Sequence, residues 1–295
     1  MPSSSGRPLA SGTPVRDALD GAITAIAAGG CETPRLDAEL LLAHALGVSR
    51  EQLYTGSAGR GEPELTVAGP AVRTFQDYVR RRAILREPVA YILGRRHFRR
   101  LELAVDQRAL IPRPETELLV EVALGLPEGA RVLDVGTGSG AVALALKDER
   151  PDLRVAGSDL SEDALALAHA NGERLELDVR WLQADLLDGV PDELDAVVSN
   201  PPYVCEQERS SLPPEILRHE PPSALFAADD GLSVIRRLVV QTGERERIRV
   251  VALEIGHEQA DAVGELMRAA GFGAVRLERD LAGIERVVIG ERLKR

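Results

Sequence analysis

Apolar residues recur at helical spacing over the first part of the chain, with no strand-like alternation between them. In the first segment they form one stripe that ends at a glycine pair, and its members are Val15, Leu19, Ile23 and Ile26. The second segment has Thr33 as a cap, Pro34 at the first helical position and Gly47 just after its end. These signals predict two consecutive helices.

Two further helices follow. Ser49 and Gln52 have the spacing of a capping box, in which each side chain bonds the backbone N–H of the other residue. Another helical stretch, rich in arginine, ends before Pro88. Short helices without intervening strands predict a separate helical domain over residues 14–88, preceded by a disordered polar leader over residues 1–13.

The pattern then changes from helical to mixed. Residues 89–112 alternate and are rich in turn formers, which predicts a β-hairpin linker. From residue 130 onward, continuous apolar runs alternate with helical patterns. Such runs are typical of strands buried on both faces, so we expect residues 113–295 to form an α/β domain with a mostly parallel, doubly wound sheet. A short connection between the last two strands favours an antiparallel pair.

Composition narrows the class of protein. The chain has 295 residues, 44% of them hydrophobic and 28% charged, and no apolar run approaches the ~18 residues of a membrane span. With a polar N-terminus that lacks an apolar signal core, this predicts a cytoplasmic protein. The formal net charge of −11 argues against a large nucleic-acid-binding surface. Two cysteines, Cys31 and Cys205, are too few for a disulfide framework, and five scattered histidines predict no metal site.

One segment departs from the acidic balance. Eight arginines lie close together, namely Arg80, Arg81, Arg82, Arg86, Arg95, Arg96, Arg99 and Arg100. The simpler interpretation is a solvated helix face followed by a solvated hairpin. The alternative is a docking surface for an acidic partner or an RNA-bound complex. The sequence leaves both open.

A glycine-rich loop follows the first strand of the alternating series. Its residues are Asp134, Val135, Gly136, Thr137, Gly138, Ser139 and Gly140. Glycines at that point let the backbone turn tightly and approach a ligand at a helix N-terminus. The GxGxxA spacing also fits a weak dinucleotide fingerprint. Alone, the loop indicates only a nucleotide-like cofactor, and a plain glycine turn stays open.

Acidic residues end the next two strands. Asp159 can accept hydrogen bonds from both hydroxyls of a ribose, although aspartate is also common at a helix start. Asp185 can bond an adenine amino group with Leu186 beside it as an apolar wall, although aspartate often ends a strand. Because the carboxyl ends of strands in a doubly wound sheet face one crevice, we expect these residues to meet the glycine loop.

The string VVSNPPYV ends a further strand on four residues, Asn200, Pro201, Pro202 and Tyr203. Two prolines cannot continue a strand, so a plain turn is one interpretation. The strand belongs to the same series, however, so Asn200 reaches the same crevice. The glycine loop, the two acidic strand ends and this string converge on one crevice, so the sequence favours a site over a plain turn.

These motifs resemble those of class I S-adenosylmethionine-dependent methyltransferases, and more closely those of release factor glutamine methyltransferases. The matching segments span residues 80–290 and read RRAILREPVAYILG, LIPRPETELLV, VLDVGTGSGAVALAL, VVSNPPYV, HEPPSALFAADDGL, LEIGHEQAD and RD…ERVVIG. The resemblance implies a small helical domain, a hairpin linker and a seven-stranded methyltransferase domain. It also implies methylation of the side-chain amide of the glutamine in the Gly-Gly-Gln loop of peptide chain release factors, and we expect a monomer.

The same resemblance implies roles for single residues. The cofactor S-adenosylmethionine would be held by Asp134, Gly136, Thr137, Gly138, Ser139, Gly140, Asp159, Asp185, Leu186 and Asn200. Of these, the glycine loop would hold the methionine part, Asp159 the ribose, and Asp185 with Leu186 the adenine. An aromatic stands in place of Leu186 in some family members, so stacking on adenine would be weaker here. Substrate binding and catalysis would fall to Asn200, Pro201, Pro202 and Tyr203.

Other functions stay open on the residues alone. An adenine-N6 nucleic-acid methyltransferase uses the same four residues on another planar NH2 group, but it needs base flipping and a basic surface. A ribosomal-protein glutamine methyltransferase shares the fold by analogy. A nicotinamide dehydrogenase shares the glycine loop and Asp159, but it gives no reason for the segment from Asn200 to Tyr203.

Overall fold

The computed structural model describes residues 12–55 and 65–293, which form two compact units that divide between Leu93 and Gly94. The sequence predicts a leader over residues 1–13, and residues 1–11 of it lie outside the described residues. Its last residue, Thr13, belongs to a short strand, β1 (Thr13–Pro14), which pairs antiparallel with β2 (Thr66–Val67).

The first unit is helical. Its helices are α1 (Val15–Ala28), α2 (Pro34–Leu46), α3 (Arg50–Thr55), α4 (Pro70–Ala83) and α5 (Val89–Leu93). The capping box is confirmed, because the Ser49 backbone N–H donates to Gln52 Oε1 at 2.8 Å and the Gln52 N–H donates to Ser49 Oγ at 3.4 Å. Thr33 occupies the cap position of α2, but its hydroxyl donates to Asp37 Oδ1 at 2.9 Å and does not cap the helix.

The prediction of a hairpin linker over residues 89–112 is wrong for its first five residues. Residues 89–93 form α5, and Ile92 packs into the core of the helical unit. The hairpin itself comprises β3 (Arg95–Phe98) and β4 (Leu101–Ala104) and belongs to the second unit. A five-residue apolar run fits a helical turn and a strand equally well, so local pattern could not separate them.

An ion pair lies inside the helical unit. The Arg82 Nε–H donates to Asp37 Oδ2 at 2.6 Å, and the two residues are only 6% and 5% exposed. Burying either charge without the other carries a large desolvation cost. This pair therefore constrains α2 against α4.

Replacing Arg82 by methionine is expected to lower the free energy of unfolding of the helical unit by about 3 to 5 kcal/mol, because Asp37 keeps a buried charge without its ion pair. Hydrogen exchange of the α1–α4 amides in the full chain measures this loss. The control is Arg80→Met, which breaks an exposed pair with Asp77 and should cost less than about 1 kcal/mol. Equal losses in the two variants would contradict the assignment.

The arginine cluster is largely paired inside each unit. Its partners are Asp77 for Arg80, Glu87 for Arg81, Asp37 for Arg82, the Gly29 carbonyl for Arg86, Glu102 for Arg95, the Pro112 carbonyl for Arg96, and Glu149 for Arg99. These contacts favour a structural role for the cluster over a docking surface.

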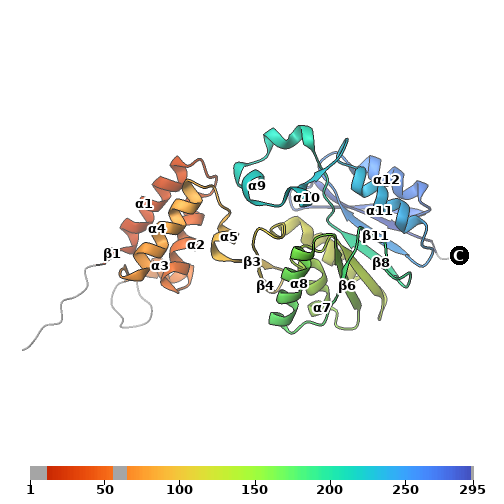
Figure 1. The fold of residues 1–295 in the computed structure, drawn as a ribbon, viewed down its shortest axis with the longest axis horizontal. Helices are drawn as coiled ribbons and strands as arrows, with labels where there is room; N and C mark the ends of the chain where they lie inside the picture. The colour runs from red at the N-terminus through yellow and green to blue at the C-terminus, as the bar shows by residue number, and fades with distance from the viewer. Residues whose placement is uncertain (1–11, 56–64, 294–295) are drawn as a thin grey trace, which may run out of the picture. The chain divides into compact units, whose positions relative to one another are not determined.

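The second unit is built on a seven-stranded sheet in the order β12-β13-β11-β8-β5-β6-β7. Figure 1 shows three of its strands, β6, β8 and β11, among the helices of this unit. The strands are β5 (Arg131–Val135), β6 (Arg154–Asp159), β7 (Arg180–Gln183), β8 (Ala196–Ser199), β11 (Val250–Glu254), β12 (Ala274–Arg279) and β13 (Glu285–Glu291). β13 runs antiparallel to both of its neighbours, β11 and β12, and the other strand pairs of this sheet are parallel. The mostly parallel sheet and the antiparallel last pair are thus confirmed.

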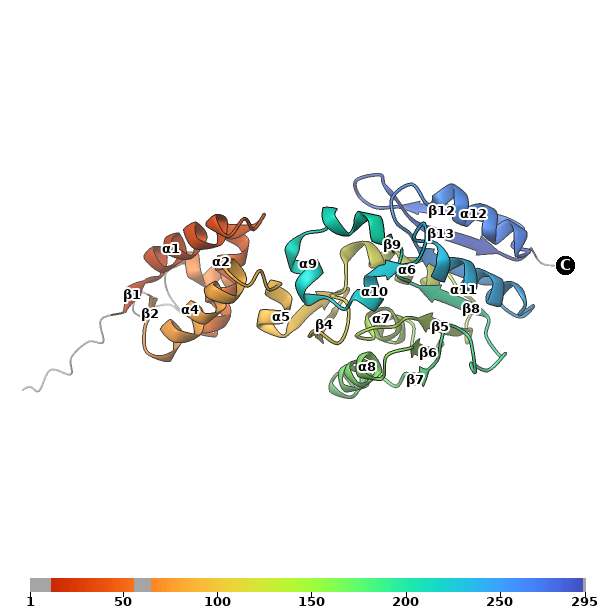
Figure 2. The ribbon, with the colours of Figure 1, turned by 45° about the horizontal axis from the view of Figure 1, so that its top comes forward.

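Helices cover both faces of this sheet (Figure 2). One group packs against the strands of the sheet and comprises α6 (Glu117–Leu124), α7 (Ala141–Glu149) and α8 (Glu162–Leu175). The other group comprises α11 (Ser233–Gly243) and α12 (Ala260–Ala269), whose apolar side chains share a core with those of β5, β8 and β11. No helix among the described residues is long and apolar enough to cross a membrane.

A segment of short elements connects β8 to α11. It contains β9 (Val204–Cys205), η2 (Glu206–Ser211), α9 (Pro214–His219), α10 (Pro222–Leu225) and β10 (Phe226–Ala227). The chain leaves β5 toward β6 on one side and returns to β8 on the other. This reversal of strand order creates a crevice at the carboxyl ends of β5 and β8, where open α/β sheets bind their ligands.

Candidate active site

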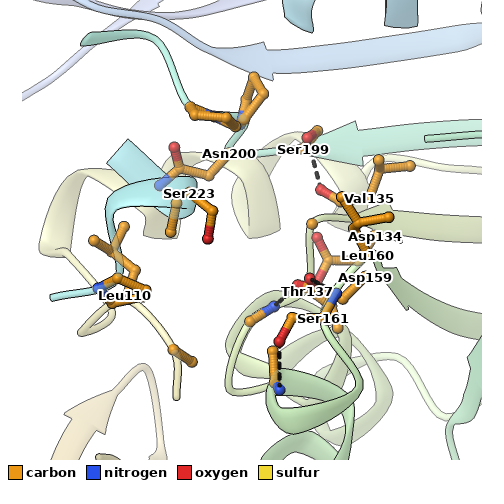
Figure 3. A pocket seen from close by; sticks show the side chains of 18 of the residues that line it. Leu110, Asp134, Val135, Thr137, Asp159, Leu160, Ser161, Ser199, Asn200 and Ser223 are labelled. Carbon is orange, nitrogen blue, oxygen red and sulfur yellow. Dashed lines mark hydrogen bonds between the residues drawn. The ribbon is translucent and has the colours of Figure 1, made fainter. Parts of the chain in front are cut away.

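A cavity of about 490 Å³ lies at these carboxyl ends, within the size range of small-molecule sites. Every residue proposed from sequence for the cofactor or substrate lines it, with two exceptions, Gly140 and Tyr203. Figure 3 shows side chains from different strands, among them Asp159 and Asn200, around this one pocket.

Strand register brings the glycine loop beside Asn200. Val135 and Ser199 are paired residues of β5 and β8, and the Ser199 hydroxyl donates to the Val135 carbonyl at 2.7 Å. The next residues, Gly136 and Asn200, are therefore neighbours across the crevice. Gly136 has a φ of 70°, which favours glycine, and a Cβ there would lie 3.9 Å from the Asn200 carbonyl oxygen.

Gly140 has a packing role instead of the expected place in the cavity wall. It begins α7 with a φ of 84°, and a Cβ at this position would lie 3.0 Å from both Leu144 and Trp181. Glycine is therefore favoured by the positive φ and by the close approach of these two side chains. Its position in the GTGSG string could not distinguish this role from ligand contact.

Asp134 holds the loop from beneath. Its side chain is almost fully buried, and Oδ2 accepts hydrogen bonds from the Thr137 hydroxyl at 2.6 Å and the Ala143 N–H at 3.3 Å. Burial raises the pKa of this carboxyl to about 7. These hydrogen bonds join Asp134 to the glycine loop and to α7, so its side chain stabilises the conformation of the loop.

Asp159 is anchored at the end of β6. Oδ2 accepts from the Gly138 N–H at 2.9 Å and Oδ1 from the Ser161 N–H at 3.0 Å. Ser161 in turn caps α8 by accepting from the Ala164 N–H at 3.2 Å. A carboxylate has about four acceptor positions, so two remain for a ligand. Those two acceptor positions suit the hydroxyl donors of a ribose diol.

Asp185 has a partner that sequence reasoning missed. Its Oδ2 accepts from Arg237 on α11 at 2.7 Å, and both side chains are about half exposed. Leu186, beside it, lines the cavity with a φ of 56°. One oxygen of Asp185 thus stays available toward the cavity wall formed with Leu186.

Asn200 is oriented by two residues from other elements. Its Nδ2 donates to Thr116 Oγ1 at 3.0 Å, and the Thr116 hydroxyl donates to Glu254 Oε2 at 2.6 Å. Thr116 ends the short helix η1 (Pro114–Thr116), and Glu254 ends β11. Burial raises the pKa of Glu254 to about 7. Glu254 follows the same strand-end rule as Asp159, and that rule would have found it.

Tyr203 does not line the cavity, where sequence predicted it would pack on the substrate. Its hydroxyl donates to Glu254 Oε1 at 3.3 Å, and its ring packs against the core shared by the sheet and α11. Burial raises the pKa of this phenol, which keeps it a neutral donor. Pro202 is the last residue of this string that lines the cavity, and the Tyr203 ring stabilises the site by packing against the core.

Another residue that sequence analysis missed, Glu220, joins two walls of the cavity. It is 4% exposed and accepts from the Ile111 N–H at 3.3 Å and from Arg113 at 2.5 Å. Ile111 and Arg113 lie on one wall, and Glu220 immediately precedes Pro221 on the other. This buried carboxylate therefore holds the segment before η1 against the segment before α10.

Two family models match the chain. The Methyltransferase small domain matches residues 114–223, and the PrmC N-terminal domain matches residues 17–94. A release factor glutamine methyltransferase of Caulobacter vibrioides is 40% identical over 273 residues, covering 88% of this chain and 90% of the relative. One of Deinococcus radiodurans is 39% identical over 283 residues, covering 94% of this chain and 98% of the relative.

The fold also resembles a solved structure. The hMettl16 catalytic domain in complex with MAT2A 3′UTR hairpin 1 superposes with a TM-score of 0.55 at 14% identity, covering 86% of this chain and 92% of that chain. At this identity the likeness concerns the fold alone.

Proposed function

This chain belongs to the release factor glutamine methyltransferases, and from that premise we propose which atom it methylates and on which substrate. The enzyme is a protein-glutamine N-methyltransferase. We propose that it transfers a methyl group from S-adenosylmethionine to the side-chain amide nitrogen of the glutamine in the Gly-Gly-Gln motif of peptide chain release factors. Modification of that glutamine would modulate translation termination.

One observation carries this proposal above the others. Asn200 is beside the glycine loop, and its Nδ2 already donates to Thr116. Its Oδ1 accepts no hydrogen bond from the described residues, so it is free to accept one N–H of a planar amide. Pro201, which also lines the cavity, would offer its carbonyl to the second N–H.

The residues around the cavity fit S-adenosylmethionine. Gly136 and Gly138 leave room for the methionine part, Asp159 has free acceptor positions for the ribose, and Asp185 with Leu186 would meet the adenine. When bound, the cofactor supplies a methyl group on a positively charged sulfur. The carboxylate of Asp159, which lines the cavity, would complement that positive charge.

The chemistry depends on orientation. An amide nitrogen is a poor nucleophile, because its lone pair is delocalised into the carbonyl. Asn200 and Pro201 would hold both N–H groups and so aim the nitrogen for in-line attack at a distance of ~3 to 3.5 Å. On transfer the N–C bond would form as the C–S bond of the cofactor breaks, and the nitrogen, acidic once methylated, would then release its proton to water. Asn200 and Pro201 therefore act without a general base.

The partner of the enzyme would be a protein. We propose a release factor as substrate, action as a monomer in the cytoplasm, and no direct contact with nucleic acid. The net charge of −11 supports the last point, because it disfavours binding to phosphate backbones.

Purified enzyme is expected to transfer labelled methyl from S-adenosylmethionine to a release factor, and not to the same factor with the loop glutamine replaced by alanine. Scintillation counting and a mass shift of one methyl group on the loop peptide measure the result. DNA, RNA and ribosomal proteins serve as competing substrates. Equal labelling of both release factor forms, or preferential labelling of a competitor, would refute the proposal.

A further inference from the structure

We propose that Thr116 and Glu254 are positioning residues that keep the Asn200 amide turned with its oxygen toward the substrate. This inference rests on the proposed function, since it assigns a direction to the hydrogen bond that Asn200 would make with the substrate amide. Neither residue lies among the four positions of the Asn-Pro-Pro-Tyr string.

The three residues come from separate elements that meet at one point. Leu253 of β11 is paired with Ser199 of β8, so the next residues, Glu254 and Asn200, lie side by side at the carboxyl edge. Thr116, at the end of η1, reaches between them. Thr116 is 5% exposed and Glu254 2% exposed, so bulk water has little access to this chain of hydrogen bonds.

The direction of the bonds follows from counting protons. An ionised Glu254 can only accept, and its two oxygens receive the hydroxyls of Tyr203 and Thr116. Thr116 has a single hydroxyl proton, which this bond uses. Its oxygen can then only accept from the third member of the chain, so the Asn200 group facing Thr116 must be the NH2.

The opposite rotamer of Asn200 would harm catalysis. A turn of 180° would place an oxygen against the Thr116 lone pairs and an NH2 toward the substrate. The substrate amide also presents N–H donors, so two donors would face each other and the nitrogen would lose its alignment. An amide alone has little preference between these two orientations, because its oxygen and nitrogen are similar in size. The carboxylate of Glu254, acting through Thr116, supplies the preference.

Replacement of Glu254 by glutamine reverses the direction of the hydrogen bonds from Glu254 to Asn200 without changing the size of the side chain. The Tyr203 hydroxyl still needs an acceptor, so the new amide oxygen faces Tyr203 and the new NH2 faces Thr116. Thr116 must then accept from that NH2 and donate to Asn200. The Asn200 oxygen is consumed, and its NH2 faces the substrate.

The test uses the full chain with the release factor and labelled S-adenosylmethionine, at about pH 8.5, where a group of pKa about 7 is ionised. Thr116→Val removes the hydroxyl at nearly constant volume, and Glu254→Gln reverses the direction of the hydrogen bonds. Each should lower kcat by about tenfold or more, as expected for a misaligned reacting group. The Kd for S-adenosylhomocysteine, measured by calorimetry, should stay within about twofold. Thr116→Ser, which keeps the hydroxyl, should retain most of kcat.

The outcomes separate the two claims. A Thr116→Val enzyme as fast as Thr116→Ser, or a fully active Glu254→Gln enzyme, overturns this inference and leaves the proposed function standing. A parallel loss of cofactor affinity and kcat in both variants also overturns it, because it indicates damage to the cavity as a whole. Absence of transfer by the unaltered enzyme overturns the proposed function and this inference with it.

Discussion

Replacing Asn200 by alanine is expected to lower kcat by about a hundredfold or more on a release factor substrate, because the variant loses the acceptor that aims the substrate nitrogen. The Thr116 hydroxyl would also lose the donor that it accepts from. Single-turnover assays with labelled S-adenosylmethionine measure methyl transfer apart from product release.

Cofactor affinity is the internal control for this variant. Asn200 lies beside the glycine loop but makes its hydrogen bond to Thr116, so the Kd for S-adenosylhomocysteine should change by less than about threefold. A variant that binds the cofactor normally and still turns over at the original rate would show that Asn200 does not position the substrate.

Replacing Asp159 by alanine is expected to have its largest effect on cofactor binding. The variant loses the acceptors for the Gly138 and Ser161 N–H groups and for the ribose hydroxyls. Hydrogen bonds to charged groups contribute about 1.5 to 3 kcal/mol each, so the Kd for S-adenosylhomocysteine should rise about a hundredfold, which corresponds to about 2.7 kcal/mol. Isothermal titration calorimetry measures this change.

Two variants bracket the effect of Asp159. Asp159→Asn keeps one acceptor oxygen and should lose about tenfold in affinity. Asp163→Ala removes an exposed acidic residue from the first turn of α8 without touching the cavity, and it should bind the cofactor within about twofold of the unaltered enzyme. If Asp163→Ala weakens binding as much as Asp159→Ala, the effect reflects net charge near α8 and no ribose contact.

The site residues that sequence analysis located share one property. Asp159 ends β6, Asn200 follows β8, and the loop from Gly136 follows β5. The alternation of strands and helices implies a parallel sheet, and in such a sheet these strand ends meet at one edge. Local pattern was therefore enough to gather them, even though they are far apart in the chain.

Two residues of the predicted site do not line the cavity, for reasons that local pattern does not contain. Gly140 belongs to the same glycine string as Gly138, yet it packs against Leu144 and Trp181 and does not line the cavity. Tyr203 belongs to the Asn-Pro-Pro-Tyr string, yet its hydroxyl bonds Glu254. Which side of a loop a residue presents depends on the backbone path and on neighbours from distant elements.

The sequence by itself determined the helical unit, the doubly wound sheet and the crevice residues, because helix caps, apolar periodicity and strand-end positions are short-range signals. Only the tertiary structure decided how the Asn200 amide is oriented. Its partner Thr116 lies 84 residues before it in the sequence, and Glu254 lies 138 residues after Thr116. A hydrogen bond acquires its direction from the donor and acceptor that meet in space, and no spacing along the chain encodes that meeting.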